Sequence, residues 1–401
     1  MRYHGGVHKP LTSLVVAVTL AHLATSVARA EDVPGKPAGP PGVYYHIERI
    51  KPGANPHELG TADLTTGKFK PKYGDLDWGL DTAVHPGSGR FAMTLRVSGD
   101  ARQITLDGKQ LDLTSDKPVI IVVGSFDKGI DSVIPGDPAC VPLKCFEQAA
   151  WFSLDGSSLY TRQLHQSSTK IRRYPLAAPS TAALVFDRKK VAAAEPAPTP
   201  DLTRWAYDAR DGIHVEAMPA LPAPGAKKPP ALPKLGKALF APKILISAPV
   251  GLLENSVMVF RREPKEQKES YFELWDVSTR KSRIAYTFAQ PFAMWHTGYK
   301  ASAPSRSFLL VAERKLLAIS IVDASVRTLA DDANALFDVS ADGRFALIET
   351  SRERTPDSRE GGPKNPLSLT IIDIATGKRV ASQALPLADA SWVRTEEARF
   401  L

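Results

Sequence analysis

Residues 337–347 read FDVSADGRFAL, and this stretch carries the pattern that decides the fold. Two apolar runs flank a short group of small polar residues with a glycine. Asp and Ser side chains bond nearby backbone amides and Gly accepts a positive φ, so the group favours a tight turn between two strands. Residues 151–160, WFSLDGSSLY, repeat the pattern, and residues 84–91 and 207–213 are looser copies. The sequence therefore predicts a recurring β-hairpin.

A second phrase consists of two apolar residues, Asp, an apolar residue, a small polar turn and a basic residue. It occurs at 274–281 (LWDVSTRK), 321–327 (IVDASVR) and 371–378 (IIDIATGK), with a looser copy at 61–68 (TADLTTGK). The last three aspartates lie 47 and 50 residues apart. One hairpin of each kind per step gives four antiparallel strands per repeat, the content of one propeller blade.

The composition agrees with a turn-rich, all-β chain, because 33 of the 401 residues are Pro and 27 are Gly. The first hairpin turn recurs at a mean step of about 51.5 residues, which favours a single β-propeller of seven four-stranded blades over one of six. The phrases resemble the blade repeats of TolB-like and WD-repeat propellers, although the Trp-Asp pair occurs once, at Trp275-Asp276. The resemblance implies a central tunnel and a loop-rich face that binds ligands or proteins. Some propellers of this kind are hydrolases or dehydrogenase subunits.

The two ends of the chain complete one blade in this interpretation. Residues 390–393 read as an innermost strand, and residues 398–401 as the start of the next one. Residues 43–48 alternate like a second strand, and Asp63 marks the turn from the third strand to the fourth. One strand from the C-terminus and three from the N-terminus would then close the ring and remove its unpaired sheet edges.

The region around residues 186–243 fits a blade least well, because proline removes the donors that a central strand needs. Residues 218–243 contain five lysines and no acid, and we interpret them as a Pro/Lys-rich linker inserted in the fourth blade. A boundary between two smaller β domains is the alternative.

Residues 1–30 have the order of a secretory signal peptide, which would leave residues 31–401 as the propeller domain. Arg2 and Lys9 are followed by an apolar run over 11–27 and by Ala28-Arg29-Ala30, with small residues where a signal peptidase requires them. A membrane anchor is the competing interpretation, but the run is short and contains His22. We expect export to the periplasm or, alternatively, the extracellular space, and no membrane span in the mature protein.

Two cysteines, Cys140 and Cys145, are separated by four residues. This spacing suits a small disulfide-closed loop in an oxidising compartment, whereas redox-active pairs usually have two intervening residues. Tryptophan recurs near the predicted innermost strands, where it either packs between blades or lines a carbohydrate-stacking tunnel. These tryptophans are Trp78, Trp151, Trp205, Trp295 and Trp392.

Arginine recurs at or just after the end of the second strand in six repeats. Loops after second strands share one face of a propeller, so these side chains would ring one mouth of the tunnel and attract an anionic ligand or an acidic partner. Interleaved glutamates favour the alternative that the arginines are simply solvated. The six candidates are Arg49, Arg96, Arg162, Arg261, Arg314 and Arg352.

Catalytic signatures are mostly missing from the sequence. His57-Glu58 opens like a zinc-protease motif, but Thr61 stands where the second histidine belongs. We therefore expect no catalytic residues, metal or cofactor, and we expect a binding or scaffolding module with a protein partner in the cell envelope. Removal of the leader lowers the net charge from +8 to +5, and much of the remaining positive charge lies in residues 218–243. The rest of the chain is therefore nearly neutral, which argues against nucleic-acid binding. An anionic polymer remains a possible ligand of the basic segment. The alternatives are a lactonase-like hydrolase or dehydrogenase large subunit with a site on the tunnel axis, and a surface adhesin.

Overall fold

Residues 40–401 fold into one compact unit in the computed structural model. The structure describes residues 39–50, 56–76, 80–96, 103–112, 119–134, 136–137, 145–165, 168–189, 197–209, 211–218, 238–239, 247–262, 270–289, 299–351, 360–361, 366–387 and 392–401. The predicted signal peptide and most of the predicted linker lie outside these residues. No helix in the described ranges is long and apolar enough to span a membrane.

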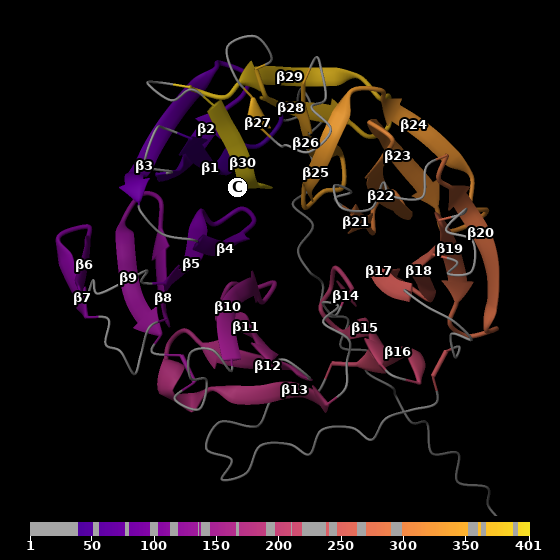
Figure 1. The fold of residues 1–401 in the computed structure, drawn as a ribbon, viewed down its shortest axis with the longest axis horizontal. Helices are drawn as coiled ribbons and strands as arrows, with labels where there is room; N and C mark the ends of the chain where they lie inside the picture. Colours follow the sequence, from indigo (N-terminus) through magenta and orange to yellow (C-terminus); the bar gives the residue numbers. More distant parts are fainter. Residues whose placement is uncertain are drawn as a thin grey trace, which may run out of the picture. The chain divides into compact units, whose positions relative to one another are not determined.

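Seven antiparallel sheets stand around a central axis, so the predicted seven-bladed propeller is confirmed (Figure 1). We number the sheets as blades 1 to 7 in chain order and give their strands from the centre outward. Blade 1 consists of β30 (Trp392–Phe400), β1 (Val43–Ile50), β2 (His57–Asp63) and β3 (Lys68–Leu76), with the short β27 (Glu360–Gly361) beside β30. Blade 2 consists of β4 (Leu80–His85), β5 (Arg90–Arg96), β8 (Val119–Ser125) and β9 (Gly129–Ile134).

The remaining blades follow the same order. Blade 3 consists of β10 (Cys145–Phe152), β11 (Ser158–His165), β12 (Ser168–Pro175) and β13 (Ala183–Lys189), with a 3₁₀ turn at Pro179–Thr181. Blade 4 consists of β14 (Ala197–Pro198), β15 (Arg204–Ala209) and β16 (Gly212–Ala217). Blade 5 consists of β17 (Ser247–Leu253), β18 (Ser256–Arg262), β19 (Ser270–Asp276) and β20 (Lys281–Thr287). Blade 6 consists of β21 (Tyr299–Ser302), β22 (Ser307–Ala312), β23 (Lys315–Ser320) and β24 (Val326–Ala330). Blade 7 consists of β25 (Ala333–Val339), β26 (Phe345–Thr350), β28 (Ser368–Asp373) and β29 (Arg379–Ala384).

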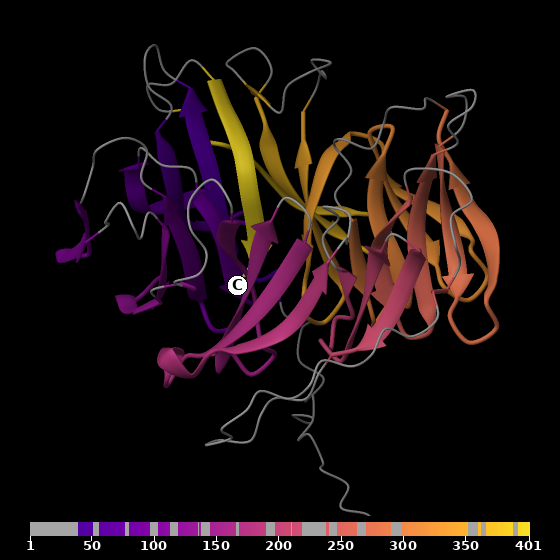
Figure 2. The same ribbon diagram turned by 60° about the horizontal axis from the view of Figure 1, so that its bottom comes forward.

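Closure of the ring joins the two ends of the described chain in blade 1. β1 pairs antiparallel with β30, from Val43 opposite Phe400 to Ile50 opposite Trp392, with a bulge at His46/Ile47. The side view shows β30 and β1 running along each other (Figure 2). The C-terminal part differs from the prediction, because residues 398–400 continue the innermost strand and do not begin a second one. As predicted, one strand from the C-terminal part of the chain and three from the N-terminal part complete the blade.

One repeat position also differs from the prediction. In blade 4, residues 207–213 contain the turn between the second and third strands, whereas the sequence placed the first turn there. The first turn lies at Thr199–Thr203, where no glycine marks it. At the first turn of blade 6, Arg306 adopts the positive φ of 46° that glycine adopts in blades 2, 3 and 7. A glycine is therefore not required at the first turn, and the search for one misplaced the first turn of blade 4.

The turn aspartates behave as the second phrase predicted. Asp63 accepts the Thr65 amide at 2.9 Å, Asp276 the Thr279 amide at 2.7 Å, and Asp373 the Thr376 amide at 2.9 Å. The hydroxyls of Thr65 and Thr66 lower the pKa of Asp63 to about 2. These short-range bonds fix the turn between the third and fourth strands without tertiary contacts.

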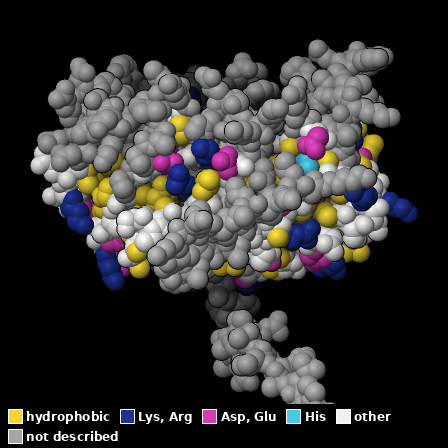
Figure 3. All heavy atoms as spheres, turned by 90° about the horizontal axis from the view of Figure 1, so that it is seen from below, with side chains coloured by type: hydrophobic (Ala, Val, Ile, Leu, Met, Phe, Trp, Pro, Cys, Tyr) yellow, Lys and Arg dark blue, Asp and Glu magenta, His cyan; other side chains and the backbone are white. Residues whose placement is uncertain are grey.

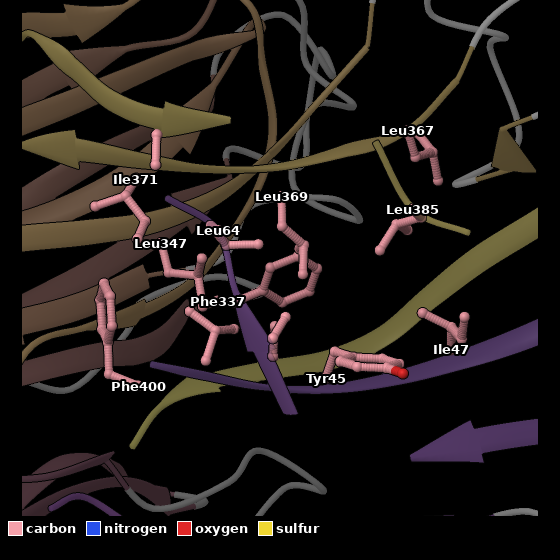
Figure 4. Packing of buried hydrophobic residues seen from close by; sticks show 14 of the residues in the cluster. Tyr45, Ile47, Leu64, Phe337, Leu347, Leu367, Leu369, Ile371, Leu385 and Phe400 are labelled. Carbon is pink, nitrogen blue, oxygen red and sulfur yellow. The ribbon is translucent and has the colours of Figure 1, made fainter. Parts of the chain in front are cut away.

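The core lies between neighbouring blades. Figure 4 shows the cluster that blade 7 and blade 1 share, where Phe337, Leu347 and Leu369 face Tyr45 and Phe400. Similar clusters fill the other seams, and Trp205 packs edge-on against Phe186 with ring centroids 4.8 Å apart. In blade 4, the Leu239 amide donates to the Ile213 carbonyl at 2.6 Å, so Leu239 lies beside β16 where other blades have a fourth strand.

Candidate functional site at the mouth of the central channel

A cavity of about 570 Å³ opens at the end of the channel where the first strands of the blades end. Every blade contributes to its wall, because each innermost strand delivers its last residues and first turn to this point. Ligand pockets commonly have volumes of roughly 300–1,000 Å³, so the cavity is large enough for a small molecule or a short peptide segment. The ring places these residues together from across the whole chain.

Blades 3 to 5 give the cavity an apolar wall. Trp151 stacks on Tyr160 with centroids 5.6 Å apart and ring planes 19° apart, so its indole is held in place. Leu154, at the rim, is 65% exposed. The remaining apolar lining of this wall includes Pro198, Pro200, Leu202 and Val250. Aromatic and prolyl surfaces of this kind lose little conformational entropy when they bind a ligand.

Polar side chains of blades 2 and 3 at the cavity already have hydrogen-bond partners within the protein. The two ring nitrogens of His85 lie 2.7 Å from Ser88 Oγ and 2.9 Å from the Leu154 carbonyl. Ser153 donates to Asp155 Oδ1 at 2.5 Å. The part of the lining that blades 2 and 3 contribute is therefore less polar toward a ligand than its composition suggests.

The opposite wall, from blades 6, 7 and 1, carries the charges Lys300, Asp338 and Arg399. Arg399 lies near the end of β30 and lines the cavity, and 28% of its side chain is exposed. Its guanidinium contacts Glu397 at 2.8 Å and donates to the Phe337 carbonyl. Asp338 accepts the Phe400 amide at 3.0 Å. Arg399 is thus held in place by blade 7 while part of it faces the cavity.

Glu397 continues this network into blade 2. Its second carboxylate oxygen accepts the Thr82 hydroxyl, and Thr82 in turn accepts the Tyr44 hydroxyl at 3.0 Å. Burial, followed by the charge of Glu397, raises the pKa of Tyr44. Both oxygens of Glu397 are therefore engaged within the protein, and the chain of bonds joins the closing strand to the next blade.

None of the four predicted arginines whose side chains the structure describes lines this cavity. Arg49 pairs with Glu58, Arg261 with Glu273 at 2.9 Å, and Arg162 donates to Gln148 at 2.7 Å. Arg314 donates to the Ser351 carbonyl at 2.7 Å. Arg96 lies in β5 but its side chain is outside the described residues, as is the whole of Arg352. The anion-binding ring stays a prediction, and two of its four described members already have a carboxylate partner.

Other arginines, which the sequence analysis did not single out, connect neighbouring blades. Arg327 donates to the carbonyls of Ile374 and Ala375 in blade 7, and Arg204 donates to the Glu254 carbonyl in blade 5 at 3.0 Å. The basic residue that ends the second phrase was a usable signal, because Arg327 occupies that position. Each such bond satisfies a turn carbonyl that strand pairing leaves open.

The remaining predicted features are described in part. Cys145 is buried at the start of β10, but Cys140 lies outside the described residues, so the disulfide stays a prediction. Trp205 is buried and Trp151 lines the cavity; Trp78 and Trp295 fall outside the described residues, as does the side chain of Trp392. Among the described side chains visible in Figure 3, basic and acidic groups are intermixed. The described residues contain no group of three His, Cys, Asp or Glu that could hold a metal.

Comparisons with known proteins show likeness at the level of the fold. No protein-family model matches the chain, and no curated protein matches its sequence. A provisionally assigned 6-phosphogluconolactonase from Bacteroides fragilis is 12% identical, with a TM-score of 0.46 over 92% of this chain and 99% of that one. AztD from Citrobacter koseri is 9% identical, with a TM-score of 0.46 over 91% and 98%. TolB from Acinetobacter baumannii is 10% identical, with a TM-score of 0.42 over 90% and 82%.

Proposed function

We propose that the protein is an exported binding module that takes its ligand in the mouth of the central channel. The observation that carries the proposal is the cavity of about 570 Å³, in which an apolar wall faces a charged one. Tight turns with internal hydrogen bonds, such as those at Asp155 and Thr199, surround the opening and supply a rigid frame. A preorganised site of this kind binds without a large ordering cost.

Export rests on the sequence of residues 1–30, and the periplasm is the destination that we propose. A disulfide between Cys140 and Cys145 would fit that compartment. The partner that we propose is a protein or a small ligand of the cell envelope. The face with the predicted arginines is a second place where a partner could bind.

Site-specific photo-crosslinking tests the location of the binding site. A photoreactive phenylalanine derivative replaces Leu154 at the rim of the cavity, or Ile284 on the outer strand β20, which is similarly exposed at 59%. In envelope extract, the Leu154 position should give one defined adduct that the Ile284 position does not. Ala341→Trp, at an exposed wall position, should abolish that adduct by filling the mouth.

Identical adducts at both positions, or an adduct that survives Ala341→Trp, would contradict the proposed site. The enzyme alternative is tested separately with a panel of lactone and ester substrates. Turnover that Ala341→Trp abolishes would replace the binding function with catalysis in the same cavity.

A further inference from the structure

The apolar wall of the channel cavity presents carbon surface to a ligand. Trp151 stacks on Tyr160 and its indole N–H is buried, so the part of its side chain that reaches the cavity is carbon. Leu154 is 65% exposed at the rim, and Pro198 and Pro200 line the same wall. An apolar ligand displaces water from such a wall favourably, because the gain in free energy grows with the apolar area removed from water.

The charges on the opposite wall balance one another. Arg399 pairs with Glu397 at 2.8 Å, and Asp338 also attracts its guanidinium. Lys300, the other basic residue of the lining, interacts with another group of the protein. These four side chains carry two positive and two negative charges, so the described charges of this wall sum to zero. An ionic ligand would lose its water in front of a neutral set of charges, which is unfavourable for either sign.

The remaining polar side chains of the described lining are also engaged within the protein. His85 has a partner for each ring nitrogen, at 2.7 and 2.9 Å. Ser153 donates to a turn carboxylate at 2.5 Å, and Thr199 donates to a turn carbonyl at 3.1 Å. Tyr299 interacts with another group of the protein as well.

These internal bonds distinguish between two kinds of occupant. A peptide segment would bring backbone amides and carbonyls, each of which needs a hydrogen-bond partner once water is excluded. An apolar small molecule brings few such groups. The lining is therefore better suited to an apolar small molecule than to a peptide.

We infer that the channel mouth binds a small uncharged apolar molecule, with its body on Trp151 and Leu154. The volume of about 570 Å³ is sufficient for a molecule with two fused rings. This inference rests on the proposed function, because it specifies the class of ligand for the same cavity.

Three naphthalene derivatives that differ in one small group test the inferred neutrality of the ligand. At neutral pH, 2-naphthalenemethanol is uncharged, 2-naphthoate is an anion and 2-naphthylmethylammonium is a cation. Displacement of the neutral fluorescent probe N-phenyl-1-naphthylamine measures the affinity of the full chain for each. The alcohol should bind roughly ten-fold more tightly than either ion, because only the ions must give up strongly bound water. An ion that binds as tightly as the alcohol would overturn the inference.

Leu154→Ser tests the apolar wall, because Leu154 is exposed at the rim and is not part of a buried seam between blades. It should weaken binding of the alcohol roughly five-fold. The matched control is Ile284→Ser on the outer strand β20, where the side chain is similarly exposed at 59%, and it should leave the affinity unchanged. An equal loss in both variants would mean binding to exposed apolar surface in general, and an unchanged affinity in Leu154→Ser would place the alcohol elsewhere. Either result would overturn the inference.

Ala341→Trp and the photo-crosslinking experiment separate the inference from the proposed function. A preference for an ion that Ala341→Trp abolishes would overturn the ligand class and keep the cavity as a binding site. A protein adduct at the Leu154 position, in a chain that binds neither the neutral probe nor the alcohol, would do the same and would favour a peptide as the occupant. Binding of the alcohol that Ala341→Trp leaves unchanged would count against both ideas. Circular dichroism spectra that match the parent confirm that each variant is folded.

Discussion

At the scale of single residues, one buried histidine of the closing blade has a strongly lowered pKa. His46 on β1 is 1% exposed, and its Nε2 lies 2.9 Å from Nδ1 of His57 on β2. Burial, followed by the proximity of His57, lowers the pKa of His46 from 6.5 to about 3. The folded protein therefore keeps this imidazole neutral at pH values where an unfolded chain would protonate it.

We predict that this histidine makes the protein less stable in mild acid. Between pH 6.5 and about pH 3 the unfolded chain binds a proton that the folded protein does not, so the free energy of unfolding falls as the pH falls. The contribution of one such group is at most about 1.4 kcal/mol per pH unit. Urea unfolding at pH 7.5, 5.5 and 4.5 measures this slope.

His46→Gln should flatten the slope between pH 6.5 and 4.5, whatever it does to stability at pH 7.5. His85→Gln is the control, because His85 lies at a surface turn and the His46 contribution should remain. An unchanged slope in His46→Gln would mean that other groups govern the acid sensitivity.

At the scale of elements, the hairpin of β6 (Gln103–Leu106) and β7 (Lys109–Asp112) is an insertion between β5 and β8 of blade 2. Its turn residues, Asp107 and Gly108, both have positive φ, as an Asp-Gly hairpin turn requires. Asp107 accepts the Tyr73 hydroxyl at 2.5 Å and the Ile130 amide at 2.9 Å. One carboxylate therefore attaches the hairpin to blades 1 and 2.

We predict that Asp107→Ala releases the hairpin and lowers the free energy of unfolding by about 2 kcal/mol, because two hydrogen bonds to a charged group are lost and alanine tolerates positive φ poorly. Asp107→Asn should cost less, since asparagine adopts this conformation and keeps one acceptor oxygen. Denaturant unfolding and limited proteolysis of the hairpin measure the difference. Equal stability of the two variants would show that the carboxylate does not attach the hairpin.

At the scale of the whole molecule, pairing of β30 with β1 makes the open row of blades into a ring. Ala398 on β30 is fully buried in the cluster between blades 7 and 1, whereas Glu396 on the same strand is exposed. A ring also removes the sheet edges that invite aggregation. The stability of every blade should therefore depend on this one seam.

We predict that Ala398→Asp lowers the free energy of unfolding by about 3 kcal/mol or more, because it buries a charge in the seam. Glu396→Ala, two residues away, is the control and should change it by less than about 1 kcal/mol. A chain that ends at Leu387 should lose cooperative thermal unfolding at the parent temperature. Parent-like melting of that truncated chain would contradict closure by β30.

The sequence by itself determined the strand content, the repeat and the seven blades. Hairpin turns are short-range structures, so the Asp, Ser and Gly residues that form them lie within a few residues of each other in the sequence. It misplaced the first turn of blade 4, where the hairpin at Thr199–Thr203 has no glycine.

The candidate site was decided by the tertiary structure. Trp151, Lys300 and Arg399 lie in different blades, and no local pattern relates them. Circular packing of the blades brings them to one mouth, and contacts such as the one between Arg399 and Glu397 then set which groups remain accessible to a ligand. Sequence patterns record neighbours along the chain, whereas a channel is built from neighbours in space.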